Sequence, residues 1–119
     1  MNDYVKILKH DDSIDVVFYI ENDNIMALGE KLEEINENAY MNGYNWEALL
    51  NFYIEQNAPE LSDTFEADPE AGMYAAYFED SPEGEKNAEA LAKVIVSLVE
   101  NEERLFDFVR ECGDEIEWD

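Results

Sequence analysis

Basic residues, histidine and cysteine are all scarce in this chain of 119 residues. It has 7 Lys and Arg against 31 Asp and Glu, which gives a formal net charge of −24. Such a chain repels the phosphates of nucleic acids and anionic membranes, so both are excluded as partners. The single Cys112 forbids an internal disulfide. The single His10 forbids a metal site with two histidines and a catalytic relay with a spare imidazole, so we expect structural roles for both residues.

The sequence also lacks a glycine-rich loop, an export signal and a long apolar run. Its five glycines stand singly, which excludes a phosphate-binding loop. The first residues, "MNDYVKILKHDDS", have no basic region followed by an apolar stretch. No later run has the length needed to cross a bilayer. We therefore expect a cytoplasmic protein without a membrane partner.

Apolar content is ordinary, with 46% hydrophobic and 13% aromatic residues, so the chain is not an acidic disordered segment. A chain of this length can bury roughly two thirds of its unfolded surface. There is no repeat, linker or low-complexity segment, and the acidic residues are spread along the whole chain. We expect one domain covering residues 1–119.

The first half of the chain changes from strand-like to helix-like periodicity. Residues 3–9 and 13–20 alternate apolar and polar side chains around "HDD", which predicts a hairpin with one buried face. From Asn24 to about Asn42, apolar residues recur every three or four positions and predict an amphipathic helix. Gly43 is expected to end it in the left-handed conformation and Asn45 to cap a second helix, which ends before Pro59. The stretch "YMNGYNWEALL" is thus a corner.

The second half predicts a strand and two more helices. Residues 58–72 indicate a short helical turn followed by a loop, and residues 73–79 a strand that is covered on both faces or placed centrally. Ser81 and Pro82 predict the start of a helix, and a further helix follows Asn101 and stops at Gly113. The order ββααβαα indicates an α+β fold in which a small, mainly antiparallel sheet packs against helices.

With so many acidic residues, some carboxylates must lie close together, and a carboxylate enzyme stays open as an alternative. "DDSID" and "EADPEAG" each resemble part of a calcium loop. Neither has the ligands, glycine and closing Glu at the required positions. We therefore predict no metal site, no cofactor and no catalytic residue.

Two clusters are candidates for binding a protein partner. The tail "GDEIEWD" surrounds one aromatic side chain with carboxylates, a composition typical of interface anchors with electrostatic steering. Its residues are Asp114, Glu115, Glu117, Trp118 and Asp119. Alternatively, Ile116 and Trp118 point inward from a last edge strand.

The second cluster, "EADPEAGMY", places Glu66, Asp68 and Glu70 on a loop beside the strand that carries Tyr74. Loops held by a rigid scaffold often carry recognition residues. A plain surface turn explains the same pattern equally well.

Three long strings, "EINENAYMNGYNWEALLNFYIEQNAPEL", "DPEAGMYAAY" and "GDEIEWD", resemble the immunity protein 51 family of bacterial polymorphic toxin systems. The resemblance extends from about Tyr4 to Asp119. It implies a small cytoplasmic α+β protein, encoded beside a secreted toxin, that binds and neutralises that toxin. It implies no enzymatic activity and no particular contact residues.

Charge and resemblance lead to the hypothesis of a binding module that occludes a basic toxin, such as a nuclease, with Trp118 or Tyr74 supplying buried contact. One alternative is an acidic regulator or nucleic-acid mimic that inhibits a host ribonuclease or another basic protein. Another is adaptation to high salt, in which case stability should climb steeply with salt concentration.

Overall fold

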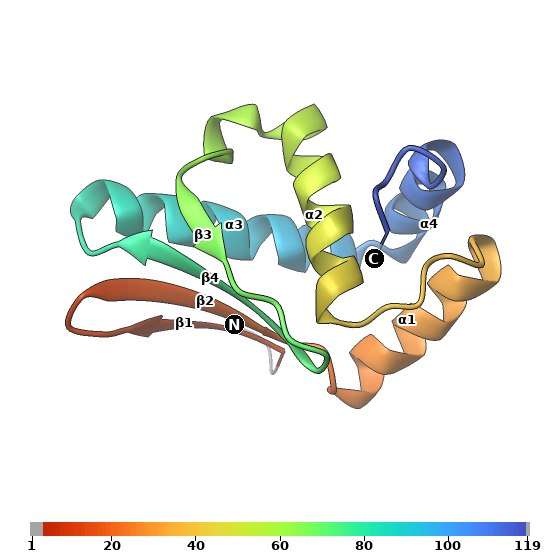
Figure 1. Ribbon diagram of the computed structural model, residues 1–119, viewed down its shortest axis with the longest axis horizontal. Helices are drawn as coiled ribbons and strands as arrows, with labels where there is room; N and C mark the ends of the chain where they lie inside the picture. The colour runs from red at the N-terminus through yellow and green to blue at the C-terminus, as the bar shows by residue number, and fades with distance from the viewer. Residues whose placement is uncertain (1–3, 119) are drawn as a thin grey trace.

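The computed structural model describes residues 4–118 and contains a four-stranded antiparallel sheet packed against helices (Figure 1). The strands are β1 (Val5–Lys9), β2 (Ser13–Tyr19), β3 (Phe65–Ala67) and β4 (Met73–Glu79), and their order in the sheet is β1-β2-β4-β3. The helices are α1 (Asp23–Ile35), α2 (Gly43–Asn57), α3 (Pro82–Glu100) and α4 (Glu102–Cys112). The predicted α+β class and antiparallel sheet are confirmed.

The β1–β2 hairpin forms as its alternating pattern predicts, with Ile7 opposite Val16. The prediction of a single buried face is wrong for β2, since Asp15 and Val17 on its other face are buried too. Because β2 lies between β1 and β4, side chains of both neighbours shield it. Asp15 Oδ2 also lies 3.1 Å from Nε2 of the exposed His10.

The predicted loop at residues 58–72 contains an additional strand. A short 3-10 helix at Pro59–Leu61 matches the expected helical turn, and β3 then pairs with β4. Three residues are too few to show an alternating pattern in sequence. The ring centroids of Phe65 and Phe78 lie 5.1 Å apart where the two strands pair, and this contact stabilises the short strand β3.

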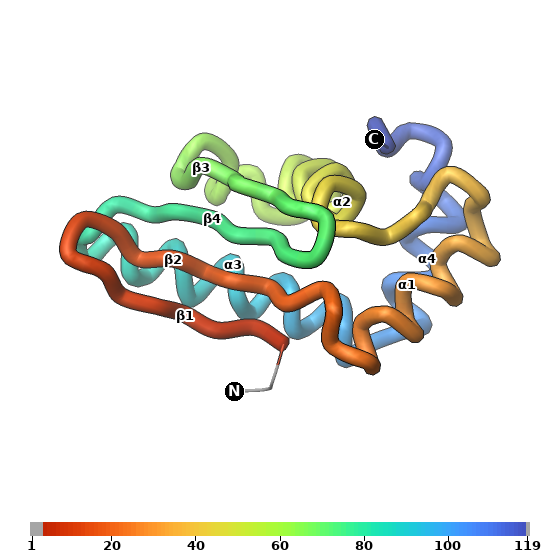
Figure 2. The backbone as a smooth tube through the Cα atoms, turned by 60° about the horizontal axis from the view of Figure 1, so that its bottom comes forward, coloured from red at the N-terminus to blue at the C-terminus, as the bar shows by residue number. Residues whose placement is uncertain are grey.

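Helices α2 and α3 lie on one face of the sheet, whereas α1 and α4 lie side by side beyond one end of it (Figure 2). α3 runs along β1, β2 and β4, α2 packs on β4, and α1 contacts α4. Helix α3 starts with Pro82 in its first turn, and the Ser81 hydroxyl accepts a hydrogen bond from Gly84 N, as predicted. No helix among residues 4–118 is long and apolar enough to span a membrane.

The connection between α1 and α2 is a corner, but its predicted details are wrong. α1 ends at Ile35 because Asn36 uses its side chain to accept from the Asn38 backbone, an arrangement that competes with helix. Gly43 is the first residue of α2, and no glycine among the described residues has positive φ. The cap is Asn42, whose Oδ1 accepts from Asn45 N at 2.9 Å.

Candidate partner-binding groove

The second predicted cluster lies on the β3–β4 hairpin and stays exposed. Glu66 is in β3, Asp68 accepts a 2.8 Å hydrogen bond from the Tyr77 hydroxyl, and Glu70 pairs with Met73 across the turn. All three carboxylates face solvent. They lie along the exposed β3–β4 hairpin and line none of the groove described below.

Tyr74 is not a surface residue, so its predicted role as a partner contact is wrong. Its side chain is 0% exposed, on the face of β4 that packs on the helices. The hydroxyl has no hydrogen-bond partner among residues 4–118. Burial and the nearby negative charge of Glu47 both raise the pKa of Tyr74. Alternation in the sequence defined two faces of this strand but not which face the helices cover.

The tail cluster is partly gathered into a groove. Glu115, Glu117 and Trp118 line it, whereas Asp114 is exposed outside it and Asp119 lies outside the described residues. The alternative of a last edge strand is wrong, because Glu115 N and Ile116 N both donate to Cys112 O and turn the chain back beside α4. Ile116 is buried, as that alternative required.

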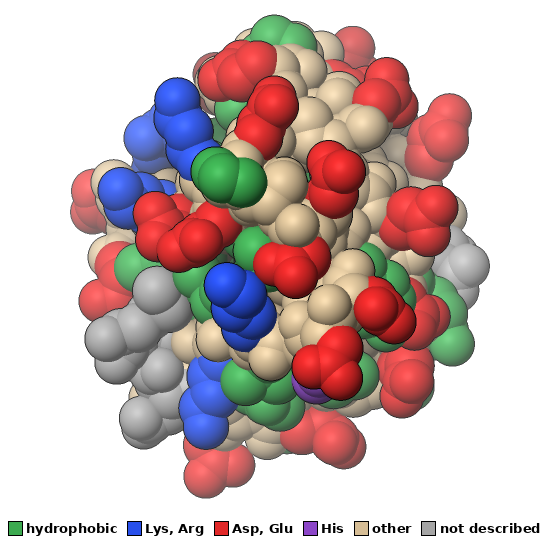
Figure 3. Space-filling view, turned by 90° about the vertical axis from the view of Figure 1, so that its left-hand side faces the viewer, with side chains coloured by type: hydrophobic (Ala, Val, Ile, Leu, Met, Phe, Trp, Pro, Cys, Tyr) green, Lys and Arg blue, Asp and Glu red, His purple; other side chains and the backbone are tan. Residues whose placement is uncertain are grey.

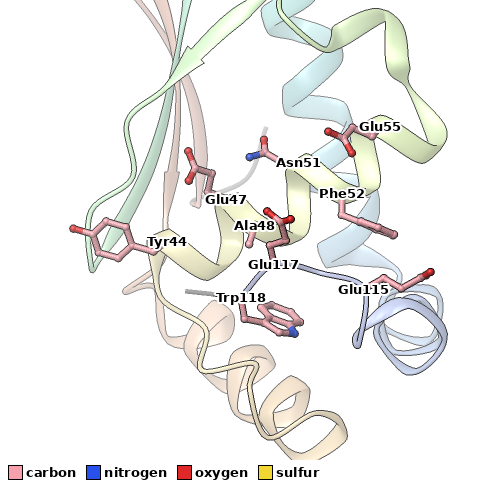
Figure 4. A pocket seen from close by; sticks show the side chains of 9 residues that line it. All are labelled: Tyr44, Glu47, Ala48, Asn51, Phe52, Glu55, Glu115, Glu117 and Trp118. Atoms are coloured by element: carbon pink, nitrogen blue, oxygen red, sulfur yellow. The ribbon is translucent and has the colours of Figure 1, made fainter.

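The groove runs between the exposed side of α2 and the tail, and has a volume of about 660 Å³. Figure 4 shows Trp118 and Glu117 on the tail opposite Ala48 and Phe52 on the helix. The lining residues are Tyr44, Glu47, Ala48, Asn51, Phe52, Glu55, Glu115, Glu117 and Trp118. Three of them are aromatic and four carry carboxylates, and none is basic.

Helix α2 contributes two parallel rows to this groove. Tyr44, Ala48 and Phe52 are spaced by four residues and form an apolar row, because such residues lie one above another on a helix. Glu47, Asn51 and Glu55 form a polar row beside it. This wall of α2 was not among the site residues predicted from the sequence. Its signal was an aromatic row outside the buried stripe of Trp46, Leu49, Leu50, Tyr53 and Ile54.

The tail side of the groove is held by its own hydrogen bonds. Trp118 Nε1 donates to the Gly113 carbonyl at 2.9 Å, and the ring is half-buried against the core. The indole therefore keeps one orientation before any partner arrives, which lowers the entropy lost on binding.

Negative charge in the groove is not neutralised by the protein. None of Glu47, Glu55, Glu115 and Glu117 forms an ion pair or a side-chain hydrogen bond with the described residues 4–118. Burial raises the pKa of Glu47, because removal from water disfavours the charged form.

Glu47 gives a testable dependence of stability on pH. A raised pKa means that the folded state holds its proton more tightly than the unfolded state, so ionised Glu47 lowers stability above that pKa. We expect Glu47→Gln to raise the free energy of unfolding at pH 7 by a small amount, about 0.5 kcal/mol. The gain should shrink as the pH falls through the folded pKa and vanish below the ordinary value of 4.5.

Urea denaturation of both proteins from pH 4 to pH 8 measures this difference. Glu55→Gln, at an exposed position of the same row, controls for the general relief of negative charge. A gain for Glu47→Gln that grows toward low pH would contradict the assignment.

Other reactive groups offer little chemistry. The half-buried Cys112 thiol has its pKa raised by burial and by the charges of Glu115 and Glu111, which disfavours the nucleophilic thiolate. No group of three or more His, Cys, Asp or Glu within residues 4–118 is arranged to hold a metal ion.

Figure 3 shows carboxylates scattered over one end of the molecule, with hydrophobic and basic side chains between them.

Comparison with known proteins agrees with the resemblance noted in the sequence. The sequence model of the Immunity protein 51 family matches residues 5–113, which is nearly the whole chain. Neither the search of curated proteins nor that of solved structures found a match. The matched range contains the whole α2 wall of the groove and ends just before the tail wall. This chain belongs to the Immunity protein 51 family, whose members are immunity proteins of toxin systems.

Proposed function

We propose that this protein binds the toxic domain of a cognate toxin in the cytoplasm of the producing cell and blocks its active site. The toxic domain presents a basic surface, as a nuclease does where it holds phosphates. The protein acts by occupying that surface and transforms no substrate. Family membership supports the immunity role, and charge supports the basic partner.

The proposal of a basic partner rests on the large number of carboxylates without a cationic partner in the protein. Within residues 4–118 two ion pairs are close, Lys31–Glu102 and Arg110–Asp107, and His10 contacts Asp15, although the sequence holds 31 acidic residues. Negative charges without internal partners create a field that attracts a cationic protein and speeds its association.

Binding to the toxic domain encoded beside this chain's gene tests the proposal. We expect tight binding at low ionic strength, and an association rate constant that falls about tenfold or more between ~20 mM and ~300 mM salt, because salt screens steering. Stopped-flow mixing gives the rates, and isothermal titration gives the affinity. Absence of heat and of complex formation at low ionic strength would remove the proposal.

The acidic regulator of a host ribonuclease predicts a different result. Such a protein would bind several unrelated basic proteins with similar affinity. Titration against a basic ribonuclease of the host, under the same conditions, separates the two functions. We expect binding to the toxic domain to be at least about 1000-fold tighter, a difference that steering alone does not produce.

A further inference from the structure

We propose that the groove between α2 and the tail is the surface that receives the toxin, and that it takes a basic segment of the toxic domain. Lysine or arginine cations of that segment pair with the carboxylates of the groove, and their stems pack on its aromatic side chains. The inference rests on the proposed function and adds to it the place and the chemistry of contact.

The charge of the groove selects a cationic occupant. Four carboxylates line it without any lysine, arginine or histidine. A neutral segment would bury these carboxylates without partners, which is strongly unfavourable. Glu47 is already partly desolvated, as its raised pKa indicates. A cation placed beside Glu47 would offset that penalty. Binding of a basic segment is therefore favoured by this carboxylate, whereas binding of a neutral segment is disfavoured.

The aromatic side chains of the groove suit arginine in particular. A guanidinium is planar, is more weakly hydrated than an ammonium, and stacks on aromatic faces. Trp118 is held in place by Gly113, and Phe52 packs against Phe108 with ring centroids 6.0 Å apart. Both rings are therefore rigid surfaces on which an apolar stem or guanidinium plane can lie.

Spacing along α2 limits the shape of the segment. Glu47 and Glu55 are eight residues apart, which corresponds to about 12 Å along the helix axis. An extended segment covers nearly the same distance in four residues, at about 3.3 Å each. Two basic residues four apart on a strand or loop, or eight apart on a helix, would thus face both carboxylates. The carboxylates of Glu115 and Glu117 lie on the opposite wall (Figure 4).

Two variants with the same change in net charge test this inference. In the groove variant, Glu47, Glu55, Glu115 and Glu117 are all replaced by glutamine. In the control variant, the exposed residues Glu30, Glu33, Glu34 and Glu37 are replaced by glutamine. Both variants keep side-chain size and lose four negative charges, and thermal unfolding confirms that each is folded.

Binding to the toxic domain encoded beside this chain's gene is then measured by surface plasmon resonance. We expect the groove variant to bind at least about 100-fold more weakly, mainly through faster dissociation, because close charge pairs are lost. The control variant should change affinity less than about fivefold, mainly through slower association. Trp118→Ala should weaken binding at least about tenfold, whereas Tyr40→Ala, at an exposed aromatic outside the groove lining, should not.

The outcomes separate the inference from the proposed function. If wild type binds tightly and both charge variants weaken equally, only long-range steering operates and the groove is not the contact surface. If the groove variant binds as well as wild type, the inference is likewise overturned, while the proposed function stands. If wild type does not bind the toxic domain at all, both are removed.

Discussion

Replacement of Gly43 by alanine is expected to destabilise the protein by about 3 kcal/mol, because two pieces of backbone occupy the space of the new methyl group. A Cβ at this position would lie 1.8 Å from the Glu70 carbonyl oxygen and 2.3 Å from that of Met73. Neither carbonyl can swing away as a side chain would. The start of α2 must therefore separate from the β3–β4 turn, and the hydrogen bond from Gly43 N to Ala71 O is lost.

Gly29→Ala is the matched control for this experiment. Gly29 lies inside α1, where alanine favours the helix by about 1 kcal/mol. Its new Cβ would approach the Met41 side chain at 3.0 Å, in an irregular connection that can shift by a few tenths of an ångström. We expect a net change below about 1 kcal/mol. Urea denaturation followed by circular dichroism measures the free energy of unfolding of both variants. If Gly43→Ala is as stable as wild type, the start of α2 does not pack closely against the backbone of the β3–β4 turn.

Trp46→Ala is expected to lower the free energy of unfolding by about 3–5 kcal/mol, the usual loss for removing a fully buried large aromatic side chain. Trp46 is 0% exposed and meets Phe18 edge to face, with ring centroids 4.9 Å apart. Its removal opens a cavity between α2 and β2. Since domains of this kind are stable by only about 5–15 kcal/mol, the loss should be visible as a large drop in the urea midpoint.

Trp46→Phe separates packing from polar burial at the same position. The indole Nε1 has no hydrogen-bond partner among residues 4–118, so its removal relieves a desolvation penalty while most of the ring contact remains. We expect this variant to lose less than half as much stability as Trp46→Ala. Circular dichroism is the appropriate signal, because both substitutions remove a fluorophore. Equal losses for the two variants would show that a phenyl ring keeps none of the packing of the indole at this position.

Much of the secondary structure could be predicted because its signals are local. Alternation in residues 13–20, the Ser81–Pro82 start of α3 and the periodic stripe of α2 each reflect a preference of the segment itself. The prediction of the helix ends between α1 and α2 was wrong because several local preferences competed in that connection. Asn36, Asn42, Gly43 and Asn45 all suit helix ends, and the sequence alone does not say which of them acts.

The candidate site was predictable only on one side. Trp118, Glu115 and Glu117 attract attention because they stand together in a short tail. Glu47, Phe52 and the rest of the α2 wall lie sixty or more residues away in sequence. They become part of the groove only because Glu115 N and Ile116 N turn the tail back beside α4. The misplacement of Tyr74 has the same origin, since only the packing of helices decides which face of β4 is buried.

The sequence by itself determined the α+β class, the acidic character and the positions of most helices and strands, because composition and periodicity act over a few residues at a time. It also indicated the immunity family through long distinctive strings. Tertiary structure alone decided that β3 joins the sheet, that Gly43 touches the β3–β4 turn, and that tail and α2 enclose one acidic groove. Those features depend on contacts between segments far apart in the chain, and side-chain packing selects them only when the whole domain has folded.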